Sequence, residues 1–145
     1  MAAITPTAFS PYLVLKNVTA EAAATNTFWF DVPRWVQNVI VTFNFTDAAA
    51  GTGHSSVVTL RAADPVSRDD TNDHAVLLTS ATITAASFHT YAIGPGLGTD
   101  SADSATADAY QNEDRHIPSI LGVRIANAAG TGATYTYTLT VNFRS

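Results

Sequence analysis

The sequence contains no cysteine, only one lysine (Lys16), and few charged residues of any kind. Without cysteine, neither disulfides nor a cysteine-based zinc site can stabilise the chain. Charged residues make up 13% of the composition, about half of the quarter that is typical of soluble domains. Hydrophobic residues make up 46%, and alanine, threonine, serine and asparagine replace the missing charges. Such a neutral, hydroxyl-rich composition is more usual in secreted, virion or assembly proteins than in cytosolic enzymes.

The few charges are unevenly placed and sum to a negative total. The formal net charge is −5, and nine of the 12 acidic residues lie between positions 64 and 114. Nucleic-acid binding requires many cations that neutralise phosphates, so seven scattered basic residues argue against a nucleic-acid partner. The sequence has no 18-residue apolar run and no basic-then-apolar leader, so we expect no membrane span and no signal peptide. We expect a complete cytoplasmic translation product that folds without processing.

Hydrophobic periodicity predicts a chain made of β-strands. Over residues 133–143 the large apolar side chains alternate with threonines and Asn142, so they share one face of a strand; they are Tyr135, Tyr137, Leu139, Val141 and Phe143. The threonine side suits a pleated surface that meets solvent or another subunit. Further strands are predicted at residues 12–16, 25–32, 36–46, 55–62, 75–79, 87–93 and 119–126.

About eight short strands and no helical pattern favour an all-β, antiparallel β-sandwich of the jelly-roll kind. A chain of 145 residues is long enough for one such domain with a real core. The last two strands are predicted to pair as a local hairpin closed by residues 127–132. The core shared by the two sheets is predicted to contain Phe28, Phe30, Val41, Phe43, Tyr135 and Leu139.

Two segments lack the strand pattern, and we expect both to become ordered on a partner. Residues 1–11 are predicted to form an extended N-terminal arm, because Pro6 and Pro11 bias the preceding residues toward extended conformations. Residues 12–145 then form a single β-sandwich domain, in which residues 94–117 are one long loop. The apolar residues expected to contact the partner are Ile4 and Phe9 in the arm and Leu97, Tyr110 and Ile117 in the long loop.

Two tryptophans complete the candidate partner-binding residues. If Phe28 and Phe30 face the core, Trp29 points to the opposite face of its strand, and Trp35 follows the break at Pro33. Three interpretations of Trp29 remain open: packing beneath a loop or the arm, an anchor in a protein interface, or a platform on which a sugar ring stacks.

No pattern of metal ligands is present. The four histidines, at positions 54, 74, 89 and 116, lie in different segments without metal-ligand spacing. Asp69, Thr71 and Asp73 alternate as in a calcium loop. However, the sixth position is His74 rather than glycine and the twelfth is Ser80 rather than glutamate, so a solvated turn is favoured.

No catalytic signature is present either. The glycine-rich residues 94–98 lack the lysine and the helix of a phosphate-binding loop. Neither a Gly-x-Ser-x-Gly motif nor a Ser-His-Asp cluster can be recognised. We therefore expect a non-enzymatic protein with no catalytic residue, no cofactor and no metal.

A short proline-containing arm leads into a cysteine-free domain rich in alanine, threonine and glycine, which ends on a threonine-alternating strand at residues 134–144. In these features the chain resembles small structural proteins of tailed bacteriophages, above all capsid decoration (cement) proteins. The resemblance implies a virion protein, made in the host cytoplasm, that sits on the outer capsid surface and bridges neighbouring subunits of the major capsid protein. It also implies a homo-oligomer, with a trimer expected and a dimer as the alternative. A carbohydrate-binding jelly roll of a phage fibre or secreted protein, and a tail or baseplate module, are the alternative functions.

Overall fold

Ten strands and no helix make up the part of the chain that the computed structural model describes, namely residues 12–49, 53–63, 74–128 and 134–145. The strands are β1 (Tyr12–Ala22), β2 (Thr25–Asp31), β3 (Asn38–Ala49), β4 (Ser56–Ala63), β5 (His74–Thr79), β6 (Ser87–Ile93), β7 (Asp100–Ala102), β8 (Ala109–Glu113), β9 (Ile120–Asn127) and β10 (Thr134–Arg144). The all-β prediction is confirmed, with two strands more than the eight expected. The predicted arm, with Ile4 and Phe9, and the aspartate loop at 69–73 lie outside the described residues.

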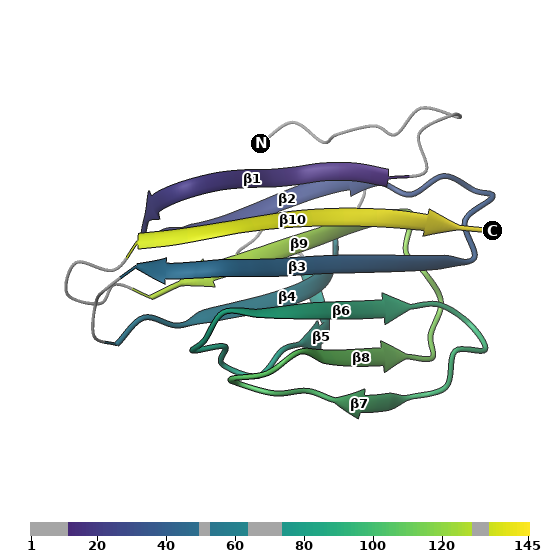
Figure 1. Cartoon of the computed structure of the whole chain (residues 1–145). Helices are drawn as coiled ribbons and strands as arrows, with labels where there is room; N and C mark the ends of the chain where they lie inside the picture. The colour runs from purple at the N-terminus through teal and green to yellow at the C-terminus, as the bar shows by residue number, and fades with distance from the viewer. Residues whose placement is uncertain (1–11, 50–52, 64–73, 129–133) are drawn as a thin grey trace.

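The strands form two sheets that lie face to face (Figure 1). The larger sheet has six strands in the order β1-β10-β3-β6-β8-β7, and the smaller has four in the order β2-β9-β4-β5. Four antiparallel pairs are nested inside one another along the chain: β1 with β10, β2 with β9, β3 with β6, and β4 with β5. The chain is therefore folded back on itself like a long hairpin, and successive parts of that hairpin belong to opposite sheets.

The core lies between the two sheets and is built from the apolar face of each strand. All six predicted core residues, Phe28, Phe30, Val41, Phe43, Tyr135 and Leu139, are buried in one continuous cluster. Along β10, every apolar residue of the alternating pattern is buried while the intervening threonines remain partly exposed. Period-two alternation therefore predicted correctly which face of this strand is covered.

The last two strands do not pair as a hairpin, and that prediction is wrong. β9 lies in the smaller sheet between β2 and β4, whereas β10 lies in the larger sheet between β1 and β3. Both strands are apolar on the side facing the core, and such strands can be neighbours either in one sheet or across the core. The connection between them needs to span only the ~10 Å that separates stacked sheets, so its length permits both arrangements.

The hydroxyl of Tyr135 joins two of the connections that cross between the sheets. It donates to the carbonyl oxygen of Ala128, which follows β9, and it accepts a hydrogen bond from the amide of Ser55, which precedes β4, at 3.2 Å. The amide of Ala128 in turn donates to the carbonyl of Ser55 at 2.9 Å. These bonds satisfy buried polar groups at the end of the sandwich away from Trp35.

Residues 94–117 were predicted to be one long loop, and this prediction is also wrong. They contain β7 and β8, which extend the larger sheet beyond β6. β8 runs parallel to β6, so the sheet is not purely antiparallel as expected. An aspartate side chain connects this segment to the body, because Asp108 accepts a hydrogen bond from the amide of Phe88 on β6 at 2.8 Å. Asp114 accepts from the amide of Gly96 at 2.9 Å and joins the two ends of the segment. Since these strands are short and polar, they carry no apolar alternation that sequence reasoning could detect.

Candidate functional site

An ordered turn between β2 and β3 presents Trp35 at one end of the sandwich. The amide of Val36 donates to the carbonyl of Pro33 at 3.1 Å and closes the turn. On one side, the amide of Val32 donates to the carbonyl of Ser119 at 2.9 Å. On the other, the amide of Gln37 donates to the carbonyl of Arg144 at 2.7 Å. Hydrogen bonds therefore fix the turn to Ser119, just before β9 of the smaller sheet, and to Arg144, at the end of β10 of the larger sheet.

Trp35 is partly exposed, yet its ring is held in place by a contact with a buried residue. Its side chain is 43% exposed, and its ring meets that of Phe143 edge to face, with centroids 6.4 Å apart. Phe143 is buried and makes the same kind of contact with Phe30 in the core, at 6.0 Å. Aromatic pairs in this geometry add about 0.5–1.5 kcal/mol beyond the burial of their area. Trp35 is therefore a preorganised apolar group at the surface.

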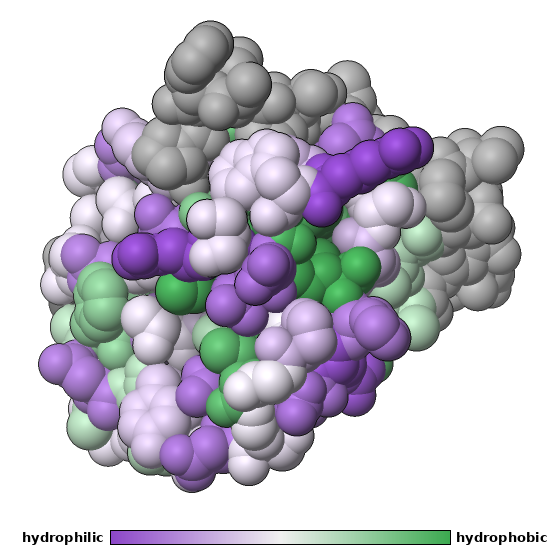
Figure 2. Space-filling model, turned by 90° about the vertical axis from the view of Figure 1, so that its right-hand side faces the viewer, coloured by the Kyte–Doolittle hydropathy of each residue, from purple (hydrophilic) through white to green (hydrophobic). Residues whose placement is uncertain are grey.

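A small pocket lies beside Trp35. Its volume is about 220 Å³, and it is lined by Val32, Pro33, Arg34, Val36, Ile117, Pro118 and Ser119. Figure 2 looks onto this end of the molecule and shows apolar surface open among polar side chains. Arg34 is exposed and makes no hydrogen bond or ion pair with the described residues. We refer to Trp35 together with this pocket as the apolar end.

The apolar end is suited to holding an aliphatic side chain of another molecule. The pocket is smaller than the ~300–1,000 Å³ of typical small-molecule sites. Five of its seven lining residues are apolar, and the hydrogen bond between Val32 and Ser119 connects the two segments that form its walls. A rigid aromatic residue beside a shallow apolar pocket is the arrangement found at the centre of many protein–protein interfaces.

The structure brings some of the predicted partner-binding residues together and separates others. Trp35 and Ile117 both belong to the apolar end, and Leu97 lies half-buried in the turn that follows β6. Tyr110 is on β8, where its side chain is 41% exposed on the outer side of the larger sheet. The role of these residues in binding stays a prediction.

Trp29 has a different environment from that of Trp35. It points to the outer side of the smaller sheet, as predicted, but it is only 3% exposed. Its ring occupies the space above Gly122 on the neighbouring strand β9, where a side chain would overlap it. This burial favours packing among the three interpretations of Trp29.

Sequence reasoning did not identify Arg34, Val32, Val36 or Pro118 as parts of a site. The signal available was the Pro33-Arg34-Trp35 break directly after an apolar strand. Trp35 after that break was a candidate partner-binding residue, but nothing indicated a pocket, because the second wall comes from residues 117–119, more than 80 positions along the chain.

A buried polar cluster, which the sequence did not reveal, joins Ser87, His89 and Asp103. His89 is fully buried; its Nε2 lies 2.6 Å from the hydroxyl of Ser87, and its Nδ1 lies 3.8 Å from a carboxylate oxygen of Asp103. Asp103 also accepts hydrogen bonds from the amides of Ala81 and Ser104. Burial lowers the pKa of the His89 imidazole, although the negative charges of Asp103 and Asp108 oppose this effect.

The cluster has the geometry of a structural polar network rather than that of an accessible catalytic nucleophile. Ser87 is buried, and its hydroxyl also lies 2.9 Å from the carbonyl oxygen of Ala85, to which it donates. The 3.8 Å between His89 and Asp103 is too long for the hydrogen bond that orients a catalytic histidine. The cluster connects β6 to the chain that follows β7.

Within the described residues, no group of three or more histidine, cysteine, aspartate or glutamate side chains is placed to hold a metal ion. That part of the chain likewise contains no helix long and apolar enough to cross a membrane. Comparisons with protein-family models, with curated proteins and with solved structures gave no match to this chain.

Proposed function

We propose that the two sheets form a jelly roll, with β7 and β8 as an addition to its margin. A jelly roll has eight strands in two sheets and combines two Greek keys. Without β7 and β8, the order β1-β10-β3-β6 faces the order β2-β9-β4-β5. The four nested antiparallel pairs support this topology, because rolling up one long folded hairpin produces them.

We propose further that the protein is a non-enzymatic virion structural protein. It binds the outer surface of an assembled capsid and stabilises the particle by bridging subunits of the major capsid protein. Jelly rolls occur in viral capsid proteins and also in lectins, so the fold alone does not select this function. The low charge of the chain supports it, since a surface that is buried on assembly must not leave charges unpaired.

The observation that carries the proposal is the apolar end. Trp35 is exposed but immobilised by Phe143, so it loses little conformational freedom when a partner covers it. The adjacent pocket can receive an apolar side chain, and the exposed Arg34 can pair with a carboxylate at the rim. A ligand that binds only the assembled particle stabilises that state by mass action.

The experiment compares capsids of the encoding virus stripped of this protein with capsids to which it has been added back. Decorated particles should lose integrity at a higher temperature. Trp35→Ala should weaken binding to stripped capsids about 30-fold, the effect of removing a hot-spot side chain worth about 2 kcal/mol. Val76→Ala is the matched control, because Val76 is at least as exposed as Trp35 but lies on β5.

Identical melting of stripped and decorated particles would exclude the capsid role. Binding to a bacterial surface polysaccharide, lost in the Trp35→Ala variant while capsid binding is absent, would instead support the carbohydrate-binding alternative.

A further inference from the structure

The strand register shows which residues lie side by side on the outer side of the larger sheet. Across the sheet, Val14, Thr140, Thr42, Thr90 and Tyr110 are direct neighbours in one row. A parallel row contains Tyr12, Asn142, Ile40, Ala92 and Asn112, and a third contains Asn17, Thr138, Asn44 and Phe88. We call these 14 residues the threonine face.

The threonine face contains no charged residue, although the chain carries 12 acidic and seven basic side chains. Charged residues stand at the margins of the sheet. Asp100 on β7 is the register partner of Asn112 and accepts a hydrogen bond from the Tyr110 hydroxyl at 3.0 Å. Lys16 and Glu21 lie on the edge strand β1, and Arg144 ends β10. In a protein with a net charge of −5, the centre of this face is therefore an area on which close approach of a like-charged molecule meets little repulsion.

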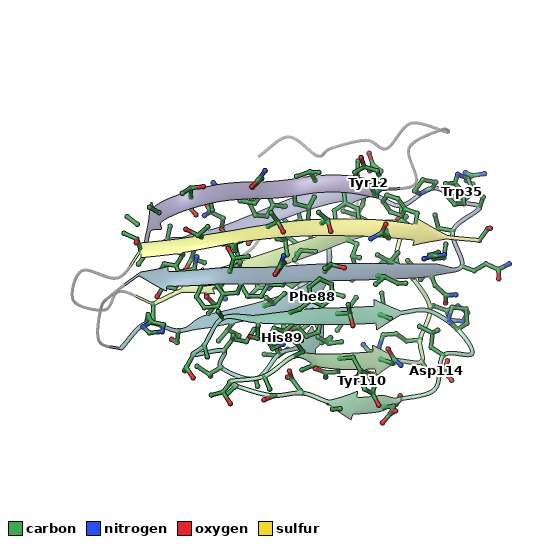
Figure 3. The ribbon with its side chains drawn as sticks, in the orientation of Figure 1. Tyr12, Trp35, Phe88, His89, Tyr110 and Asp114 are labelled. Atoms are coloured by element: carbon green, nitrogen blue, oxygen red, sulfur yellow. The ribbon has the colours of Figure 1, made fainter. Side chains whose placement is uncertain are left out.

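The same face gathers exposed apolar side chains. Among the described residues, six large hydrophobic side chains are exposed, and four of them belong to the threonine face; these are Tyr12, Val14, Phe88 and Tyr110, at 41–53% exposure. Figure 3 labels the three aromatic ones on β1, β6 and β8. On the outer side of the smaller sheet Trp29 and Arg61 are buried, and Val76 on the edge strand β5 is the one large hydrophobic side chain among the described residues that is exposed there. The larger sheet thus exposes more large hydrophobic side chains than the smaller sheet does.

We propose that the threonine face is the interface of a homodimer with twofold symmetry. Hydroxyl and amide groups can both donate and accept hydrogen bonds, so a face of threonine and asparagine can satisfy an identical face. A charged or acceptor-only surface cannot pair with itself in this way. A twofold interface needs such self-complementarity, because the same patch is used by both subunits.

The size of the sheet is sufficient for a stable dimer. With strands about 4.8 Å apart and about 3.3 Å per residue, the six strands span roughly 800 Å² of flat area. A standard specific interface buries about 800 Å² on each partner. An interface of this size therefore includes the charged margins of the sheet, β7 among them, as well as the threonine face at its centre.

This inference is independent of the proposed capsid function. The apolar end lies at the ends of the strands rather than on the outer side of the sheet, so a dimer would leave Trp35 accessible (Figure 3). Two copies related by a twofold axis make a dimer, whereas the resemblance to decoration proteins implied a trimer.

Sedimentation equilibrium of the purified full-length chain at 10–100 μM tests the interface. The wild type should have twice the 15.3 kDa mass of one chain. Thr42→Lys should shift the protein to a monomer, because it places two like charges near the twofold axis without a partner. Thr79→Lys, at an exposed threonine on β5 of the smaller sheet, should remain a dimer. A monomeric or trimeric wild type, or a Thr42→Lys variant that folds and remains dimeric, would overturn the proposal.

A second measurement applies if Thr42→Lys fails to fold. Because the chain has no cysteine, Thr140→Cys and Thr79→Cys each introduce a single thiol. A short bis-maleimide should link Thr140→Cys into covalent dimers at least tenfold faster than Thr79→Cys. Equal rates at the two positions would contradict an interface on the threonine face.

Discussion

The ring of Trp35 meets the ring of Phe143 edge to face, with centroids 6.4 Å apart. Phe143 is the last buried residue of β10, and through Phe30 it connects the surface turn to the core between the sheets. The only exposed tryptophan among the described residues is therefore linked to the buried core by two successive ring contacts.

This contact should appear as an energetic coupling in a double-mutant cycle. Trp35→Ala and Phe143→Leu, made singly and together, should be non-additive by about 0.5–1.5 kcal/mol in the free energy of unfolding, measured by urea denaturation. Pairing Trp35→Ala with Phe45→Leu is the control. Phe45 is buried on β3 against Tyr135 and makes no ring contact with Trp35, so the two changes should add. Additivity in both cycles would show that Trp35 is not held by Phe143.

Replacement of Gly122 should destabilise the smaller sheet. A Cβ at this position would overlap the buried ring of Trp29, so Gly122→Ala should lower the free energy of unfolding by about 1–3 kcal/mol through overpacking. Trp29→Leu removes the obstructing ring, so the double variant should lose less stability than the two single losses combined. Thermal unfolding followed by circular dichroism measures all three variants. If the losses add, the glycine is not required by close packing against Trp29.

The stability of the protein should fall as the pH is lowered below 6.5, partly because of His89. Burial lowers the pKa of His89 in the folded state below its unfolded value, so the unfolded chain takes up the proton first. The contribution of the neutral imidazole is fully present above the unfolded pKa and is lost as the pH falls toward the folded pKa. For one proton, the slope is at most about 1.4 kcal/mol per pH unit.

Urea unfolding of the wild type and of His89→Gln between pH 7.5 and 5.0 isolates this effect. The other titrating groups contribute equally to both proteins, so the wild type should lose stability more steeply than the variant. Parallel pH profiles would mean that the His89 imidazole binds its proton equally well in the folded and unfolded chains.

Local periodicity decided which side of each long strand is buried. The alternation of β10 places Tyr135 and Leu139 in the core and its threonines outside, because side chains of a strand point alternately to its two faces whatever its neighbours are. The same rule placed Trp29 opposite Phe28 and Phe30. The absence of cysteine and the scarcity of charge were likewise properties of composition.

Tertiary pairing decided which strands are neighbours and what their ends bring together. The alternation of β9 and β10 is the same whether they form a hairpin or face each other across the core, so the local pattern could not distinguish the two. β8 pairs with β6 through its backbone and lacks an apolar face, so no side-chain pattern predicted this strand. The approach of Ser87, His89 and Asp103, and the pocket between residues 32–36 and 117–119, arise only when distant segments meet, because contacts between distant segments leave no period in the sequence.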